Sequence, residues 1–168
     1  MKYFKLALLI LVCCGLSACS YSSNNKDQMP KEMPNDFAFS VRFGVGSKNL
    51  IDSFNGVVVK DLISAGIAEA KMTFTQDEML SIYEQMVKIN VLGTKDLIND
   101  SGCRVKPHGE DIWQIRIGSE EKTVQWSGEY CEVTGDIKQL KDLRNFVLEI
   151  VKNKGEYKKL HEPEGAYL

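Results

Sequence analysis

Apolar and polar side chains alternate along Phe37-Ala38-Phe39-Ser40-Val41-Arg42-Phe43. Successive side chains of a strand point to opposite faces. The three phenylalanines and Val41 therefore fall on one face, and Ser40 and Arg42 fall on the other. This pattern predicts a half-buried strand, and hence a sheet that is covered on one face and polar on the other.

The residues after this strand predict further strands. Gly44-Val45-Gly46-Ser47 is typical of a turn, and an extended segment follows over residues 50–62. This segment contains Asn55-Gly56, a pair that is typical of a tight hairpin turn or of a bulge. We interpret the segment as one long bent strand with a bulge. A third strand is expected from Ala68 to Phe74.

Two helices follow from capping residues and from apolar spacing. Thr75 and Glu78 have the spacing of a capping box, which predicts a helix over residues 76–89. A second helix begins near Thr134 or Asp136, either of which can cap it, and Gly155 is a plausible stop. Apolar residues recur at helical spacing in both segments: Met79, Ile82, Tyr83, Met86 and Val87, then Ile137, Leu140, Leu143, Val147, Ile150 and Val151.

A hairpin is predicted between the helices, with strands over residues 112–117 and 122–127. If Ser119-Glu120 is the turn, Trp113 pairs with Trp126, so that both tryptophans lie on one apolar face. The element order is then three strands, a helix, two strands and a helix. We predict an α+β domain, with an antiparallel sheet of about five strands and both helices packed on one face.

The first residues are typical of a secretory signal peptide. Lys2 and Lys5 precede a short apolar run over residues 6–12, which is too short to span a membrane. Leu16-Ser17-Ala18-Cys19 resembles the lipobox of bacterial lipoproteins. The resemblance implies cleavage before Cys19 and a lipid on its thiol. An ordinary signal peptide with a cysteine near its cleavage site is the alternative.

We therefore expect three parts: a signal peptide over residues 1–18, a lipidated cysteine with a flexible tether over residues 19–36, and one domain over residues 37–168. Ser20 to Asp36 is polar, contains two prolines and shows no periodicity, as expected of a tether. The domain would lie on the outer side of the cell membrane, or on the outer membrane of a Gram-negative source.

The cysteines fit this location. Of the five, Cys13 and Cys14 leave with the signal peptide and Cys19 carries the lipid. In an oxidising compartment the remaining Cys103 and Cys131 are expected to form a disulfide. Two free buried thiols or a redox pair are the alternatives, although a redox pair normally lies close in sequence, as in Cys-x-x-Cys.

The sequence offers no catalytic set and no cofactor motif. A formal net charge of −2 argues against nucleic acid as a partner. No Gly-x-Ser-x-Gly motif is present. His108 with Glu110 and Asp111 is the nearest grouping to a metal site, but three polar residues in a loop are more often solvated. We therefore predict no catalytic residue, no metal and no cofactor.

Aromatic side chains are the candidates for a ligand or partner surface: Tyr83, Trp113, Trp126, Tyr157 and Tyr167. At these spacings Tyr83 and the two tryptophans are more often core residues. The tail from Tyr157 to Leu168 could be a strap for a partner, or it could pack on its own domain, which is the interpretation we favour.

Several short motifs carry a further likeness. They are the lipobox, Phe54-Asn55-Gly56, Lys60-Asp61, Glu78 with Ile82-Tyr83, the Cys103/Cys131 pair, and Tyr157-Lys158-Lys159-Leu160 followed by Glu162-Pro163. With these the chain resembles small lipoproteins of unassigned activity from Gram-positive, spore-forming bacteria. The resemblance implies an extracytoplasmic lipoprotein and carries over no catalytic residue.

The sequence thus favours a non-enzymatic binding domain, held to membrane lipid through Cys19 and recognising another envelope component, most simply a protein. A small-ligand-binding protein or an enzyme acting on the cell wall is the first alternative, and a deep pocket lined by Tyr83, Trp113 or Trp126 would favour it. An inhibitor of a secreted hydrolase is the second.

Overall fold

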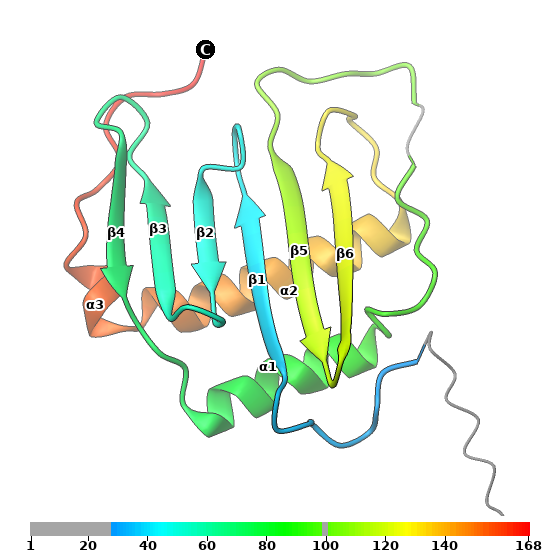
Figure 1. Cartoon of the computed structure of the whole chain (residues 1–168). Coiled ribbons are helices and arrows are strands. Elements are labelled where there is room, and N and C mark those ends of the chain that lie inside the picture. Colours follow the sequence, from blue (N-terminus) through cyan, green and yellow to red (C-terminus); the bar gives the residue numbers. More distant parts are fainter. Residues whose placement is uncertain (1–27, 99–100) are drawn as a thin grey trace, which may run out of the picture.

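Six antiparallel strands form one open sheet in the computed structural model, which describes residues 28–98 and 101–168 (Figure 1). Their order across the sheet is β4-β3-β2-β1-β5-β6. The strands are β1 (Ala38–Phe43), β2 (Asn49–Asp52), β3 (Val57–Asp61), β4 (Ile67–Lys71), β5 (Glu110–Ile117) and β6 (Glu120–Ser127). The predicted signal peptide and Cys19 lie outside the described residues.

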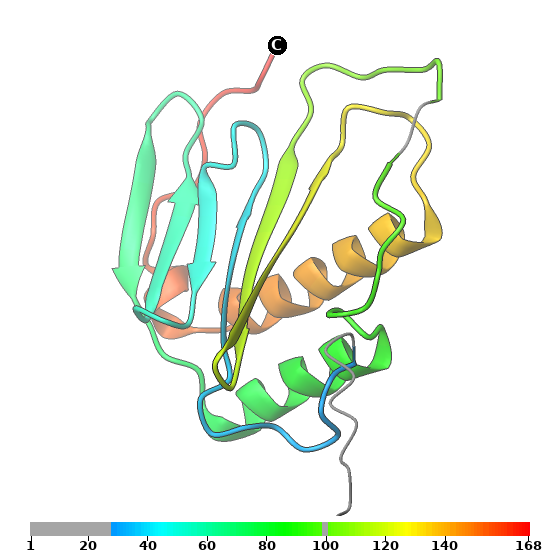
Figure 2. The same ribbon diagram turned by 45° about the vertical axis from the view of Figure 1, so that its right-hand side comes forward.

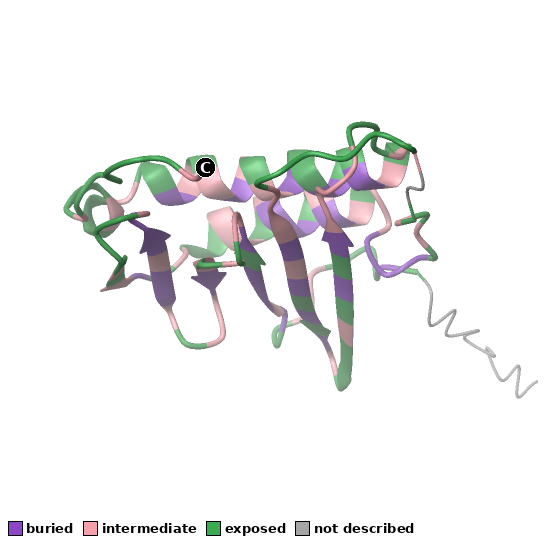
Figure 3. Cartoon of the chain, turned by 90° about the horizontal axis from the view of Figure 1, so that it is seen from above, coloured by how far each residue is buried: buried purple, intermediate pink, exposed green. Residues whose placement is uncertain are grey.

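Both long helices, α1 (Gln76–Lys88) and α2 (Gly135–Lys152), pack on the same face of the sheet. Figure 1 shows them crossing behind the strands, Figure 2 shows them together on one side of the sheet, and Figure 3 shows the opposite face of the sheet without a covering helix. A short helix α3 (Gly155–Lys158) follows α2. The predicted α+β class and the one-sided helical layer are confirmed, with six strands where about five were expected.

The alternation along residues 37–43 is confirmed. Phe39 and Val41 are completely buried, whereas Arg42 on the opposite face is exposed. β1 lies at the centre of the sheet, where Val41 pairs with Ile51 of β2 and with Trp113 of β5. The core between sheet and helices includes Phe39, Val41, Ile51, Val58, Ile82, Tyr83, Met86, Trp113, Ile115, Leu140, Val147 and Val151.

The interpretation of residues 50–62 as one bent strand is wrong. Asn55-Gly56 lies in a hairpin turn between β2 and β3, with Asp52 paired to Val57. Gly56 adopts a positive φ of 61°, which favours glycine. The Asp52 carboxylate accepts hydrogen bonds from the backbone N–H groups of Phe54 and Asn55, at 2.8 and 3.1 Å. These hydrogen bonds stabilise the hairpin turn, which was one of the two structures that Asn55-Gly56 allowed.

The predicted β5–β6 hairpin is present, but its register is shifted. Trp113 pairs with Val124, and Trp126 pairs with Asp111. The turn is a two-residue loop in which Gly118 adopts a positive φ of 62°, so Ile117 pairs with Glu120. The predicted pairing of the two tryptophans was therefore wrong. Because the shift is an even number of residues, both tryptophans still lie on the core face.

The helix caps match the sequence closely. Thr75 Oγ1 accepts from the Glu78 N–H at 3.2 Å, and Glu78 Oε2 accepts from the Thr75 N–H at 2.7 Å. Thr134 caps α2 by accepting from the Ile137 N–H at 3.2 Å. Gly155 does not stop α2, because that helix ends at Lys152 and Gly155 begins α3.

The packed chain begins before residue 37, where the tether was expected to end. Met29 is buried in the core, and its N–H donates to Asn90 Oδ1 at 3.2 Å. The Pro30 carbonyl accepts from the Tyr83 hydroxyl at 2.6 Å. The segment from Met29 onward therefore packs on the domain. Its Pro30 carbonyl supplies the hydrogen-bond partner that the buried phenol of Tyr83 needs.

Candidate functional site

A pocket of about 380 Å³ lies where β5 begins and β6 ends, against α2. We call it the Asp111 pocket, and its lining includes Pro107, His108, Asp111, Trp126, Lys141 and Arg144. It is larger than a groove of about 250 Å³ between α1 and α2 and a hollow of about 220 Å³ beside Phe74. Pockets of this size hold small molecules or a single side chain.

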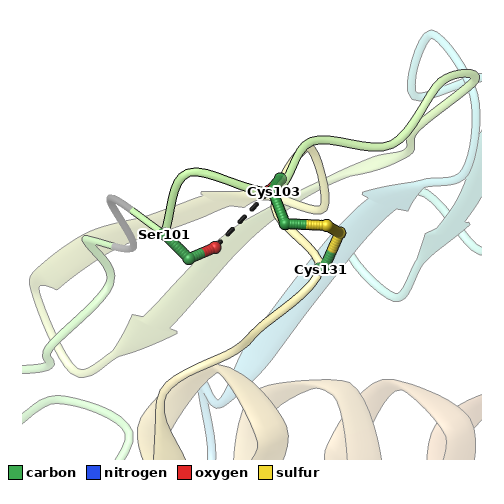
Figure 4. Close-up of a disulfide and its surroundings, with 3 residues drawn as sticks. All are labelled: Ser101, Cys103 and Cys131. Atoms are coloured by element: carbon green, nitrogen blue, oxygen red, sulfur yellow. Dashed lines mark hydrogen bonds between the residues drawn. A yellow bond between two sulfur atoms is a disulfide. The ribbon is translucent and has the colours of Figure 1, made fainter.

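A disulfide fixes the two loops around this pocket. Cys103 and Cys131 are joined with their Cα atoms 5.5 Å apart, which confirms the predicted pair. The Cys131 N–H donates to the Cys103 carbonyl at 3.2 Å, and the Val105 N–H donates to the Glu129 carbonyl at 2.7 Å. Figure 4 shows the disulfide joining the segment before β5 to the segment after β6, with the Ser101 hydroxyl bonded to the Cys103 carbonyl at 3.4 Å.

Glycines bring three backbones together at the rim. The Glu110 N–H donates to the Gly44 carbonyl at 3.2 Å, and the Gly128 N–H donates to the Gly109 carbonyl at 2.8 Å. A Cβ atom on Gly109 would lie 3.0 Å from the backbone carbon of Gly44. A side chain at Gly109 would therefore force the two backbones apart. Glycine at position 109 therefore allows the two backbones to approach each other closely.

An ion pair lies in the pocket wall. Arg144 Nη1 donates to Asp111 Oδ1 at 2.9 Å, and the side chains are 15% and 1% exposed. The Arg144 guanidinium also lies over the Phe43 ring, 5.4 Å from its centroid. Its Nε and Nη2 atoms donate to Asn145 Oδ1 at 3.3 and 3.0 Å. These contacts hold the guanidinium between the core and the pocket.

Burial perturbs the Asp111 carboxyl. Loss of hydration raises the pKa of Asp111 to about 6, and the positive charges of Arg144 and Lys141 partly oppose the rise. A carboxyl with such a pKa is still ionised at neutral pH. It is thus a charged acceptor in a poorly hydrated place, where electrostatic contacts are stronger than in water.

Unpartnered polar atoms concentrate around this pocket. Among the described residues, four buried side-chain atoms have no hydrogen-bond partner: His108 Nδ1, Asp111 Oδ2, Trp113 Nε1 and Trp126 Nε1. Three of the four belong to residues that line the Asp111 pocket. Each buried polar group without a partner costs about 1–3 kcal/mol, so such a cluster needs an explanation.

The structure separates the aromatic residues that the sequence singled out. Trp126 lines the pocket, whereas Trp113 and Tyr83 are buried in the core with 0% and 1% of their surface exposed. Tyr157 lies in α3, with the Lys60 ammonium 5.2 Å from its ring centroid. Tyr167, near the end of the chain, does not line the pocket and contacts Asp61 at the end of β3.

The tail packs on its own domain, as the favoured interpretation predicted. Figure 1 shows it rising along the β4 side of the sheet. The Tyr167 hydroxyl donates to Asp61 Oδ2 at 2.5 Å and accepts from Lys48 Nζ at 2.9 Å. The Ser64 hydroxyl donates to the Glu164 carbonyl at 2.7 Å. These contacts give the tail a structural role at the β3–β4 end.

Sequence reasoning missed Asp111, Lys141 and Arg144 as site residues. It noted His108 with Glu110 and Asp111 as a metal-like grouping, and His108 and Asp111 do line the same pocket. The sequence did contain a signal. Asp111 lies two residues before Trp113, and in a strand this spacing places both side chains on the same, buried face. An acidic residue at a core position of an alternating strand is unusual enough to indicate a paired or functional group.

The lining offers binding groups rather than a nucleophile. It contains a carboxylate, two cations, an imidazole and an indole N–H, and its one cysteine, Cys131, is in the disulfide. Within residues 28–98 and 101–168, no group of three His, Cys, Asp or Glu side chains is placed to hold a metal ion.

No family model matches the chain, and neither the curated proteins nor the solved structures contain a match. Among the helices that the structure describes, none has the length and apolar character needed to cross a membrane. The geometry of the Asp111 pocket and the sequence therefore carry the functional argument.

Proposed function

We propose that this protein is a lipid-anchored, non-enzymatic binding domain on the outer side of a bacterial membrane, and that it binds its target at the Asp111 pocket. One observation carries the proposal: of the four buried polar side-chain atoms without a partner in the described part of the chain, three belong to residues that line this pocket. A bound ligand that paired with them would offset the cost of their burial.

The charges of the lining favour binding over a merely structural role. Lys141 is exposed and has no ion-pair partner among the described residues, while Arg144 and Asp111 neutralise each other. The pocket therefore keeps one excess positive charge next to a dry carboxylate. A pocket of about 380 Å³ admits a small molecule, or the terminal residue of an envelope protein, but not a folded surface.

The indole N–H signals of the two tryptophans provide a direct test. The full chain, labelled with ¹⁵N-tryptophan and purified from membranes in detergent, is mixed with a soluble envelope extract of its source. We expect a saturable shift of the Trp126 indole signal, while the signal of Trp113 stays in place because that residue lies outside the pocket. Trp126→Phe assigns the two signals.

Two charge reversals on α2 form a matched control. Lys141→Glu should abolish the shift, because it removes the unpaired cation of the lining. Lys138→Glu, a similar change one turn earlier and outside the lining, should leave the shift intact. A Trp126 signal that no fraction of the extract moves, or an equal response of Lys141→Glu and wild type, would contradict the proposal.

The anchor is tested separately with Cys19→Ala. We expect the substituted protein to leave the membrane fraction, because two acyl chains on one cysteine supply the binding that a single chain lacks. A wild-type precursor that stays in the cytosol with residues 1–18 intact would contradict the anchor without bearing on the pocket.

A further inference from the structure

We propose that the Asp111 pocket binds a free α-amino acid, with the ligand's ammonium against Asp111 and its carboxylate against Lys141 and Arg144. This inference rests on the proposed function and specifies the chemistry of the ligand. It follows from the pairing of opposite charges in the lining and from the hydrogen-bonding groups that remain unused there.

Donors for a carboxylate come from α2 and β6. The Lys141 ammonium has no carboxylate partner among the described residues. Arg144 uses one N–H of each nitrogen, so its Nη1 and Nη2 atoms each keep a second N–H. The buried indole N–H of Trp126 has no partner within residues 28–98 and 101–168. Together these groups can satisfy both oxygens of a carboxylate.

An acceptor for an ammonium comes from β5. Asp111 Oδ1 accepts from Arg144, whereas its Oδ2 has no partner within the described part of the chain. The side chain is 1% exposed, so an unpaired oxygen at this depth is costly. A ligand N–H₃⁺ group supplies three donors to this oxygen and its surroundings. His108 Nδ1, also buried and without a partner among the described residues, belongs to the lining of the same pocket.

Ligands with a single charge fit this lining less well. A carboxylate without an ammonium would lie near the Asp111 carboxylate and would leave Oδ2 unpaired. An amine without a carboxylate would lie near Lys141 and Arg144 and would leave the Trp126 N–H unpaired. Like charges at close range repel each other strongly in a poorly hydrated site, so either ligand would bind more weakly. A zwitterion satisfies both halves of the pocket.

Three ligand mixtures separate these chemistries in the same NMR measurement. The first is a racemic mixture of the free amino acids whose side chains are uncharged. The second contains the same amino acids with an acetyl group on the α-amino group, and the third contains them with the α-carboxylate converted to a carboxamide. We expect the free amino acids to shift the Trp126 indole signal with at least about tenfold higher affinity than either blocked mixture, a difference of one charge-assisted contact.

Variants assign each half of the ligand to its partner. Lys141→Glu should weaken binding of the free amino acids about tenfold or more, while Lys138→Glu should not. Asp111→Asn should remove the preference for free over N-acetylated amino acids, because its amide no longer attracts an ammonium. Circular dichroism and an unchanged Trp113 signal show whether each variant is folded.

The possible results distinguish this inference from the proposed function. If the N-acetylated mixture binds as well as the free mixture, the assignment of the ammonium to Asp111 is overturned. If no amino acid shifts the Trp126 signal but the envelope extract does, the ligand class is wrong and the pocket stands. If neither moves the signal, both proposals fail.

Discussion

Two buried aspartates, which lie on β3 and β5 at the same edge of the sheet with β2 and β1 between them, have opposite environments. Asp61 lies at the end of β3 and is 7% exposed, and Asp111 lies in β5 and is 1% exposed. Asp61 is fully used: its Oδ1 accepts from the Ile63 N–H at 2.9 Å, and its Oδ2 accepts from the Tyr167 hydroxyl at 2.5 Å. Asp111 uses Oδ1 for Arg144, and no described residue pairs with its Oδ2.

The difference teaches which buried charge is structural. The chain's own tail reaches Asp61, so the surroundings of Asp61 are closed by groups of the protein itself. The Asp111 site has a disulfide, glycines at the rim and a pocket, but lacks such a closing segment in the described chain. Buried polar groups that a protein satisfies by itself stabilise a fold, and those left unsatisfied indicate a binding site.

The largest expected effect concerns the disulfide. Replacing both Cys103 and Cys131 by serine should lower the free energy of unfolding by about 3.5 kcal/mol, since the covalent link across 28 residues restricts the unfolded chain. Urea denaturation measures this loss, with Lys138→Glu as a neutral control. Native-state hydrogen exchange should increase around β5 and β6 and remain unchanged at the tail. An equal increase of hydrogen exchange at the tail and at β5 and β6 would contradict the comparison.

The next effect depends on pH. The pKa of Asp111 is about 6 in the folded protein and near 3.8 in the unfolded chain, so the folded state holds the proton more tightly between these values. The contribution of Asp111 to stability is therefore fully present below pH 4 and is lost as the pH rises to about 6. The free energy of unfolding of wild type, relative to Asp111→Asn, should fall by about 2–3 kcal/mol across this window.

Denaturation of both proteins at several pH values measures this difference and cancels the titration of all other groups. A constant difference between wild type and Asp111→Asn would contradict the buried environment of Asp111.

A smaller loss of stability is expected when the contact between the tail and Asp61 is removed. Tyr167→Phe removes the hydroxyl that donates to Asp61 and leaves a buried carboxylate oxygen unpaired, as at Asp111. We expect a loss of about 1–2 kcal/mol in the free energy of unfolding. Tyr157→Phe, in the same terminal segment, is the control, because no hydrogen bond of its hydroxyl is part of this contact. An unchanged stability would show that the tail contact is incidental.

The smallest effect on stability is expected at Lys141. Its side chain is exposed and unpaired, so Lys141→Glu should change the free energy of unfolding by no more than about 0.5 kcal/mol. The same change should weaken ligand binding strongly. A large loss of stability would mean that Lys141 holds the fold together, and the loss of binding could then not be attributed to the pocket.

The sequence was sufficient for the layers of this fold. Alternation around Val41, the capping box at Thr75 and the apolar stripe of α2 are local signals, and each predicted its element. Strand pairing depends on turn geometry, which local patterns specify poorly. Gly118 rather than Ser119-Glu120 sets the β5–β6 turn, and Asp52 bonding decides that Asn55-Gly56 is a hairpin.

The site was harder to predict than the fold, because its members come from four separate segments. His108 precedes β5, Asp111 lies in β5, Trp126 lies in β6, and Arg144 lies in α2. The sequence did single out Trp126 and the Cys103/Cys131 pair. Asp111 Oδ1 and Arg144 Nη1 come within 2.9 Å of each other only because α2 packs across the sheet. The spacing of these residues along the chain does not predict the contact.

The titration of Asp111 is the most direct measurement, because the pocket is argued from a charged, poorly hydrated carboxylate with an unused oxygen. The carboxyl carbon signal of Asp111 in the full chain, followed by ¹³C NMR against pH and assigned with Asp111→Asn, should have its midpoint at about pH 6. A midpoint near 3.8, the ordinary value of a hydrated aspartate, would contradict the account.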